Sequence, residues 1–300
     1  MTRNHRNFST PDLAEMARQI RRDIIRMLMI SQSGHSGGPL GLADIFSCLY
    51  FKLLKYDPAN PTFSERDYFF LSAGHLAPVW YSTLARAGFY PPAELTTLRK
   101  LNTRLHGHPA PWYTHGVPGV EVASGSLGQG MSIAVGTGIG LRLDKKPNRV
   151  VVLHGDGELD EGQVWEGMMT AGHYNLDNLT AIVDRNFCQI DNRTDKVMEI
   201  EPLADKWRSF RWNVIECDGH NIEEFLGAMN TAFEFKGKPT VVIAKTYMGR
   251  GVSFMEDDYR WHGIPPSIEQ GQQALSELPQ TRFGDFHEFD WEKQPAEISK

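Results

Sequence analysis

The 300-residue chain contains little cysteine, and its cysteines follow no ligand pattern. Only Cys48, Cys188 and Cys217 are present, and none of them belongs to a CxxC pair. A disulfide framework or a zinc ribbon needs paired cysteines, so neither is expected. Cysteines this few and this scattered fit a reducing compartment, and the chain is therefore predicted to be cytoplasmic.

Long apolar runs and a surplus of positive charge are also missing. No stretch approaches the roughly eighteen apolar residues of a membrane span, and the polar residues 1–13 lack the apolar core of a secretory signal. Lys and Arg number 31 against 37 Asp and Glu, which gives a formal net charge of -6. This balance provides no electrostatic case for nucleic acid or an anionic membrane as a partner.

The composition is that of a globular domain, with 41% hydrophobic and 23% charged residues. Apolar, β-rich runs predict strands at 68–71, 150–153, 180–183, 212–217 and 239–245. The segments between them predict helices at 9–33, 40–54, 131–143 and 222–233, a helix ending at Ala87 and another over 165–172. Residues 91–119 show little periodicity and are predicted to form a long loop. This alternation implies an α/β fold with one doubly wound, mostly parallel sheet and helices on both faces.

Two oxygen-bearing side chains follow neighbouring predicted strands. The run 150–153 leads into the turn Gly155-Asp156-Gly157, and the run 180–183 leads into Asp184-Arg185-Asn186. Asp156 and Asn186 are therefore expected at the carboxyl ends of two parallel strands, where open α/β sheets bind ligands.

The chemistry that suits this placement is a hard divalent cation held against a diphosphate. A carboxylate, an amide oxygen and a nearby backbone carbonyl supply ligands that Mg²⁺ or Ca²⁺ prefers. Gly157 allows close backbone approach, and the N-terminus of the following helix favours anionic charge. The simpler alternative is a glycine-rich turn with an asparagine cap.

Several motifs together carry a family resemblance. Gly-Asp-Gly followed about thirty residues later by Asn resembles the thiamine diphosphate signature, and Glu161-Gly162 with Glu166 is similar to the transketolase version of it. Further matches occur in the family's order: SGHSGGPLG (33–41), LSAGHLAPVWYS (71–82), HGHP (106–109), GVEVASGSLGQG (119–130) and WHGIP (261–265). The resemblance to transketolases covers roughly residues 10–270 and implies the diphosphate-binding domain of the thiamine-diphosphate fold.

The resemblance implies a set of cofactor and metal residues. Asp156, Asn186 and the backbone carbonyl of Cys188 are expected to hold Mg²⁺ or Ca²⁺. Those expected to bind thiamine diphosphate are His75, Gly125, Leu127, Gly155, Asp156, Gly157, Asn186, Ile190 and His262. His75 also has an argument of its own, because a histidine just past a strand and at a helix start can donate to a diphosphate oxygen.

Catalytic and interface roles follow from the same resemblance. His35, His108 and His262 are expected to act in catalysis, with His35 and His108 binding ketose hydroxyls and helping to move protons. A lone loop histidine such as His35 is otherwise more often a surface residue. Glu161 is expected to face a subunit interface, and Glu166 to be a charge on the helix surface.

Three alternatives stay open from the sequence. A zinc hydrolase could use His106, His108 and His115, and zinc held without thiamine would favour it. The α subunit of a 2-oxoacid dehydrogenase shares the fold, although the motifs SGHSGGPLG and HGHP speak against it. A non-catalytic regulatory partner is the non-enzyme alternative, which the full set of Asp156, Asn186 and histidines disfavours.

The family needs more than this chain contains. Its pyrimidine-binding glutamate and its sugar-phosphate-binding residues lie in a further domain, which is not seen in these 300 residues. The chain is therefore expected to be the N-terminal subunit of a split transketolase, which acts on sugar phosphates and pairs with a separate C-terminal subunit in a dimer of heterodimers. Residues 1–270 are predicted to form the cofactor-binding domain. Residues 271–300 are predicted to be an extension with aromatics that dock on a partner: Phe283, Phe286, Phe289 and Trp291.

Overall fold

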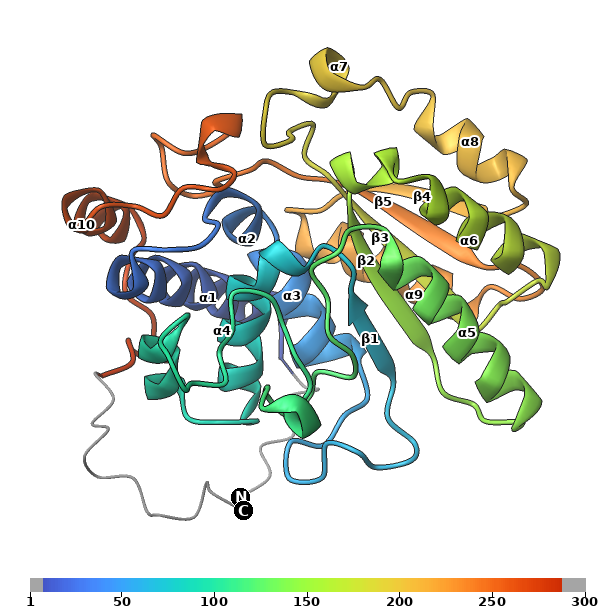
Figure 1. The fold of residues 1–300 in the computed structure, drawn as a ribbon, viewed down its shortest axis with the longest axis horizontal. Coiled ribbons are helices and arrows are strands. Elements are labelled where there is room, and N and C mark those ends of the chain that lie inside the picture. The colour runs from blue at the N-terminus through green and yellow to red at the C-terminus, as the bar shows by residue number, and fades with distance from the viewer. Residues whose placement is uncertain (1–7, 288–300) are drawn as a thin grey trace.

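The computed structural model describes residues 8–287, and its centre is a parallel five-stranded sheet in the order β1-β2-β3-β5-β4 (Figure 1). The strands are β1 (Tyr68–Leu71), β2 (Val150–Gly155), β3 (Leu179–Arg185), β4 (Asn213–Asp218) and β5 (Thr240–Lys245). All five predicted strands are found, each within two residues of the expected bounds. The predicted parallel sheet is therefore confirmed.

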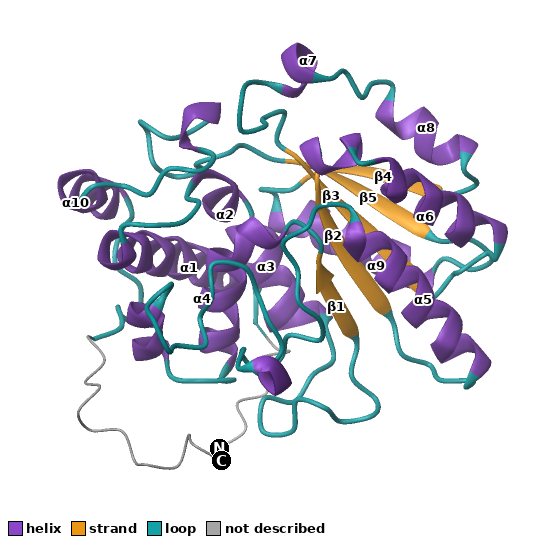
Figure 2. Ribbon diagram, in the orientation of Figure 1, coloured by secondary structure: helices purple, strands orange, loops and turns teal. Residues whose placement is uncertain are grey.

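Helices cover both faces of this sheet (Figure 2). They are α1 (Thr10–Ser31), α2 (Gly37–Gly41), α3 (Ala43–Cys48), α4 (Ala77–Ala87), α5 (Gln129–Leu143), α6 (Gly162–His173), α7 (Thr194–Val197), α8 (Leu203–Ser209), α9 (Ile222–Glu234) and α10 (Ile268–Glu277). Strand side chains alternate between two cores. Val151 and Leu153 share a core with residues of α1, α3, α4 and α9, while Val150 and Val152 pack with α5, α6 and α8. This arrangement confirms the doubly wound fold.

The predicted helix near residues 9–33 is found, whereas the one predicted over 40–54 is divided. Ser9 caps α1 through a capping box with Asp12, as the Ser-Thr-Pro-Asp start predicts. The prediction of a single helix over 40–54 is wrong, because α2, α3 and a π-helical turn share this segment. A Cβ at Gly41 would lie only 2.8 Å from the Tyr247 carbonyl oxygen, so this close backbone contact requires glycine.

The segment after residue 267 contains a helix that its polar composition did not indicate. Ser267 caps α10 through a second capping box, and Ala274 on this helix is buried. The predicted domain boundary at 270/271 falls within α10. No helix in residues 8–287 combines the length and apolar character that crossing a bilayer requires.

The chain after α10 returns to α1. Phe286 is only 4% exposed, and Phe283 packs against the same core. Arg22 on α1 donates to Asp285 at 2.8 Å. These two phenylalanines therefore pack in the chain's own core. Phe289 and Trp291 lie outside the described residues.

Candidate active site

The candidate site begins where β2 and β3 end. The two strands pair in register up to Gly155 and Asp184, so Asp156 and Asn186 leave the sheet at the same edge. Both side chains are buried, at 1% and 5% exposure. The prediction that these two residues follow the carboxyl ends of two parallel strands is confirmed.

The buried carboxylate of Asp156 has one oxygen that accepts a single hydrogen bond and one that accepts two. Its Oδ1 accepts from the Gly157 N–H at 2.8 Å, and its Oδ2 accepts from the Phe187 N–H at 2.7 Å and from Arg185 Nη1 at 2.9 Å. Burial raises the pKa of Asp156 to about 6, although Arg185 lowers it. A carboxylate whose charged form is this poorly solvated gains from a second cation at Oδ1.

Asn186 and Cys188 complete the predicted oxygen set. Asn186 Nδ2 donates to Asp184 at 2.7 Å, which directs Oδ1 toward the Cys188 N–H at 2.9 Å. Burial raises the pKa of the Cys188 thiol to about 12, so the uncharged thiol is a poor ligand compared with the backbone carbonyl. A carboxylate oxygen, an amide oxygen and a carbonyl form the donor set that Mg²⁺ or Ca²⁺ accepts. These residues fit a hard cation, and their ligand role remains a prediction.

Glu158 is a site residue that the sequence reasoning missed. It is 3% exposed, and its Oε1 accepts from the Gly128 N–H at 2.7 Å and from the Ser72 hydroxyl at 2.5 Å. Its Oε2 lies 3.1 Å from His154 Nδ1. One buried carboxylate therefore ties the ends of β1 and β2 to the loop before α5. A glutamate directly after Gly-Asp-Gly, where a buried turn is expected, was the available signal.

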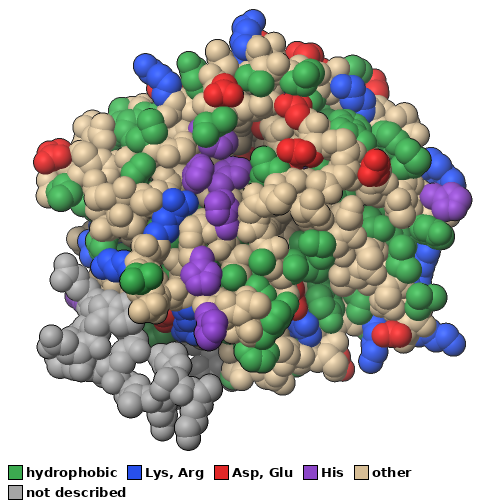
Figure 3. Space-filling model, viewed as in Figure 1, with side chains coloured by type: hydrophobic (Ala, Val, Ile, Leu, Met, Phe, Trp, Pro, Cys, Tyr) green, Lys and Arg blue, Asp and Glu red, His purple; other side chains and the backbone are tan. Residues whose placement is uncertain are grey.

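Three histidines from distant parts of the chain gather beside this edge. His35 follows α1, His75 follows β1, and His262 follows the short 3₁₀ helix Tyr259–Trp261. The ring centroids of His75 and His262 lie 5.0 Å apart, and His35 lies 5.0 Å from His75 and 5.7 Å from His262. Figure 3 shows a row of histidine side chains on the face of the molecule that is turned toward the viewer.

His108 joins the group through Gly125. A Cβ at Gly125 would lie 3.3 Å from the Cγ of His108, and a Cβ at Gly74 would lie 2.7 Å from the Gly125 nitrogen. Gly125 has φ +153°, a value that favours glycine. The loop 91–119, largely irregular as predicted, thereby brings His108 against the residue expected to contact the pyrimidine. Leu127 is half-buried, and its carbonyl accepts from Gln163 Nε2 at 3.3 Å.

The loop after Asn186 lies close to the Gly155-Asp156-Gly157 turn and to the histidine cluster. A Cβ at Gly157 would lie 2.6 Å from Gln189, so only glycine leaves room for this loop. A Cβ at Gly263 would lie 3.6 Å from His35 and 3.7 Å from Ile190. Ile190 is 62% exposed and stands at the rim of the site. The loop that follows Asn186 therefore lies next to both the Gly157 turn and the Gly263 position beside His35.

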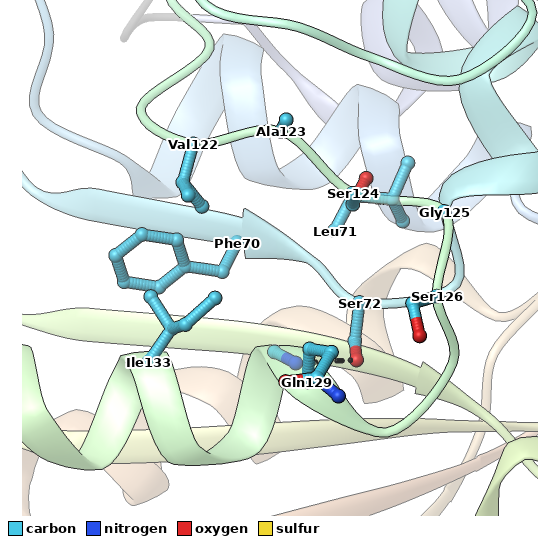
Figure 4. Close-up of a pocket in the computed structure, with 11 residues that line it drawn as sticks. Phe70, Leu71, Ser72, Val122, Ala123, Ser124, Gly125, Ser126, Gln129 and Ile133 are labelled. Atoms are coloured by element: carbon cyan, nitrogen blue, oxygen red, sulfur yellow. Dashed lines mark hydrogen bonds between the residues drawn. The ribbon is translucent and has the colours of Figure 1, made fainter.

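A cavity of about 260 Å³ adjoins this site (Figure 4). The apolar side chains of Phe70, Val122 and Ile133 line one part of it, and the loop at Gly125 lines another. Ser72, whose hydroxyl also binds Glu158, contributes a polar wall. The space is mostly apolar and lies beside the backbone expected to meet the pyrimidine ring.

The clustered histidines are predisposed to be neutral. Burial lowers the pKa of His35 to about 4, with nearby His262, Arg99 and His108 adding to the effect. Burial also lowers the pKa of His75 well below its usual range, and it lowers the pKa of His108 and His262. The Nδ1 atoms of His35 and His262 are buried without a protein partner. Neutral rings with unused nitrogens can bind hydroxyl or phosphate oxygens.

The cofactor-free chain should lose stability as the pH falls below about 6.5. An unfolded histidine gains its proton near pH 6.5, whereas the folded pKa of His35 is about 4. Between these values the unfolded state binds more protons, so unfolding becomes easier as pH falls. Replacing His35 with asparagine should reduce the drop in unfolding temperature between about pH 7.5 and about pH 5. The exposed His173→Asn variant should keep the full drop, and an equal drop in His35→Asn would contradict the assignment.

Other predicted residues stand apart from this chemistry. The His106 carbonyl accepts from the Tyr81 hydroxyl at 3.0 Å, and His115 has a left-handed backbone with φ +61°. Within residues 8–287 no group of three or more His, Cys, Asp or Glu side chains could hold a metal, so the zinc alternative gains no support. Glu161 is exposed just before the start of α6, and Glu166 is exposed on this helix. The interface role of Glu161 stays a prediction.

Sequence comparisons separate two kinds of relative. The family model described as the transketolase thiamine diphosphate binding domain matches residues 12–284. The 6-deoxy-6-sulfo-D-fructose transketolase subunit SqwG of Clostridium sp. (strain MSTE9) is 40% identical, with 89% of this chain matching 96% of that protein. One subunit of the apulose-4-phosphate transketolase of Actinobacillus succinogenes is 38% identical, with 92% matching 99%. Human transketolase is also 38% identical, but only 42% of it is covered.

Solved structures give the same result. The transketolase of Campylobacter jejuni superimposes with a TM-score of 0.86 at 31% identity, covering 93% of this chain and 44% of that one. The Leishmania mexicana transketolase gives a TM-score of 0.83 at 30% identity. The chain thus spans under half the length of these transketolases but nearly the whole of relatives named as subunits. It belongs to the transketolase family and corresponds to that family's thiamine diphosphate binding domain.

Proposed function

We propose that this chain is the diphosphate-binding subunit of a two-chain transketolase, moving a two-carbon ketol unit from a ketose phosphate to an aldose phosphate. The observation that carries this proposal is the full-length match to relatives named as transketolase subunits. The placement of Asp156 and Asn186 at the ends of two paired strands, and the clustering of His35, His75 and His262, support it. We place the enzyme in the cytoplasm. The 2-oxoacid dehydrogenase and regulatory alternatives gain nothing from the comparisons.

The proposed cofactor residues divide the work by chemistry. Thiamine diphosphate, when bound, supplies the electron sink that allows a carbon–carbon bond beside a ketose carbonyl to break. Asp156, Asn186 and the Cys188 carbonyl would hold Mg²⁺ or Ca²⁺ against its diphosphate. His75 and His262 would donate to diphosphate oxygens, and Gly155 with Gly157 would allow the backbone to approach. Gly125, Leu127 and Ile190 would contact its rings.

His35 and His108 are proposed to serve the substrate. His35 lies within the histidine cluster, and His108 lies against Gly125 at the exposed side of the same site. As a neutral imidazole, each can accept a hydrogen bond from a hydroxyl at one ring nitrogen and donate its N–H from the other. His262 lies 5.7 Å from His35 and 5.0 Å from His75, ring centroid to ring centroid, which supports a role for it close to both the substrate and the diphosphate.

Replacing His35 or His108 with alanine should lower kcat/KM of the reconstituted enzyme by about 10²-fold or more, as the loss of a proton-transfer group does. His106→Ala is the matched control, because His106 is close in sequence to His108 but is bound to Tyr81 only through its backbone carbonyl. Steady-state ketol transfer measures the effect. Unchanged kcat and KM in both variants would remove these roles.

The partner is proposed to be a separate subunit carrying the pyrimidine-binding and C-terminal domains of the family. Two sites related by a twofold axis give a dimer of heterodimers. Glu161 lies exposed at the start of α6, with its Cβ beside the position of Gly128, and is proposed to face a neighbouring subunit. Because cofactor and partner would share one cleft, each should raise the affinity for the other.

A further inference from the structure

Arg185 is a buried cation in direct contact with a proposed metal ligand. It is the last residue of β3, between Asp184 and Asn186, and is 4% exposed. Its Nη1 donates to Asp156 Oδ2 at 2.9 Å and to the Thr194 hydroxyl at 3.0 Å. The guanidinium therefore joins the turn after β2 to the start of α7.

The other side of the guanidinium reaches a third segment. Nε and Nη2 donate to Glu201 Oε1 at 3.2 and 2.8 Å, and the guanidinium carbon lies 4.0 Å from the Phe187 ring centroid. The Thr194 N–H also donates to the Phe187 carbonyl at 2.9 Å, which closes the loop 187–194. That loop carries Cys188, the proposed carbonyl donor.

These contacts determine how the donor set is oriented. Arg185 and the Phe187 N–H together occupy Oδ2 of Asp156, whereas Oδ1 has only the Gly157 N–H as a donor. Oδ1 is therefore the oxygen left for a cation. The same guanidinium fixes the loop with the carbonyl donor through Thr194.

We infer that Arg185 is a positioning residue for the divalent cation: it fixes the Asp156 carboxylate and the 187–194 loop in the arrangement that binds the metal. This inference rests on the proposed function, because it takes the cation assignment as given. Outer-shell groups that orient metal ligands typically contribute about 10–100-fold in affinity.

The charge of Arg185 acts in the opposite direction. A guanidinium beside a metal site repels the incoming cation, so removal of the charge alone would tighten binding. Positioning predicts the reverse, because an untethered carboxylate and loop must be ordered when the cation binds. Lysine at 185 separates the two effects, since it retains the charge but cannot make the several directed contacts of the guanidinium.

The test is Mn²⁺ binding to the full-length chain in excess thiamine diphosphate, followed by electron paramagnetic resonance. Arg185→Met should bind Mn²⁺ about tenfold more weakly than the native chain, and Arg185→Lys at least as weakly as that. Arg208→Met is the control, because Arg208 on α8 pairs with Asp205 and Glu216, neither of which belongs to the proposed site. It should retain native affinity.

The outcomes separate this inference from the proposed function. Native or tighter Mn²⁺ binding by Arg185→Met, with Arg185→Lys unchanged, would overturn the positioning role and leave the cation site standing. Absence of Mn²⁺ binding by the native chain would overturn both. Circular dichroism of the cation-free variants checks that each is folded, and Arg185→Lys alone decides the question if the methionine variant does not fold.

Discussion

The purified chain, freed of any co-purifying protein, is expected to show no ketol transfer from a ketose phosphate to an aldose phosphate. The chain covers 44% of the Campylobacter jejuni transketolase, and the family resemblance assigns the glutamate at the cofactor's pyrimidine to the part that is not covered. Asp156 and the histidines can hold a diphosphate, but they do not replace that glutamate. Glu158, a further buried carboxylate beside Gly128, is already engaged with Ser72, Gly128 and His154.

A coupled assay with the chain alone, at the enzyme concentrations used for reconstitution, measures this. The control is the same preparation after addition of the partner subunit, which shows that the chain is competent. Ketol transfer by the chain alone at a rate comparable to the reconstituted enzyme would contradict the division into two subunits.

Replacing Asp156 with alanine is expected to weaken thiamine diphosphate binding by about a hundredfold, or about 2.7 kcal/mol. The variant removes a buried carboxylate from the proposed cation, so the diphosphate charge is poorly compensated. It also leaves Arg185 buried without one of its acceptors, although Thr194 and Glu201 remain. Calorimetric titration of the reconstituted complex with cofactor, in excess Mg²⁺, gives the affinity.

Two further variants make this measurement specific. Asp160→Ala removes an exposed carboxylate from the same turn, which binds only Gln189 at 2.9 Å, and it should retain native affinity. Asp156→Asn keeps the shape of the side chain but loses its charge, so it should also bind the cofactor weakly. Native cofactor affinity in both Asp156 variants would show that the carboxylate is not a metal ligand.

The central strands β2 and β3 could be predicted because they are buried on both faces. Residues 150–153 form a continuous apolar run, and such runs bounded by polar turns leave few alternatives to a central parallel strand. The same reasoning placed Asp156 and Asn186 correctly, since the side chain that follows a strand end lies at the ligand-binding edge.

The helices near residues 40–54 and 268–277 were harder, because packing decides them. Gly41, the last residue of α2, packs against the backbone of Tyr247, a contact between distant parts of the sequence that no local pattern encodes. The helix α10 has a capping box, but few apolar residues follow it, so the polar composition masked the signal.

The histidine cluster shows the same limit within the site. No local pattern joins His35, His75 and His262, and only the family resemblance suggested that they act together before the rings were found within 6 Å of one another. Arg185 was missed because a charged residue after an apolar run is read as the end of the strand. Its buried contacts with Asp156 exist only once β2 and β3 are paired.

The central claim is that a complete active site requires this chain and a second subunit, and a reconstitution titration tests it most directly. A separately purified subunit carrying the pyrimidine-binding domain is added in steps to a fixed amount of the chain, with thiamine diphosphate and Mg²⁺ in excess, and ketol transfer is measured. The account predicts activity that rises from zero and saturates at one partner per chain. Activity that is present before any partner is added, and does not change as the partner is added, would contradict it.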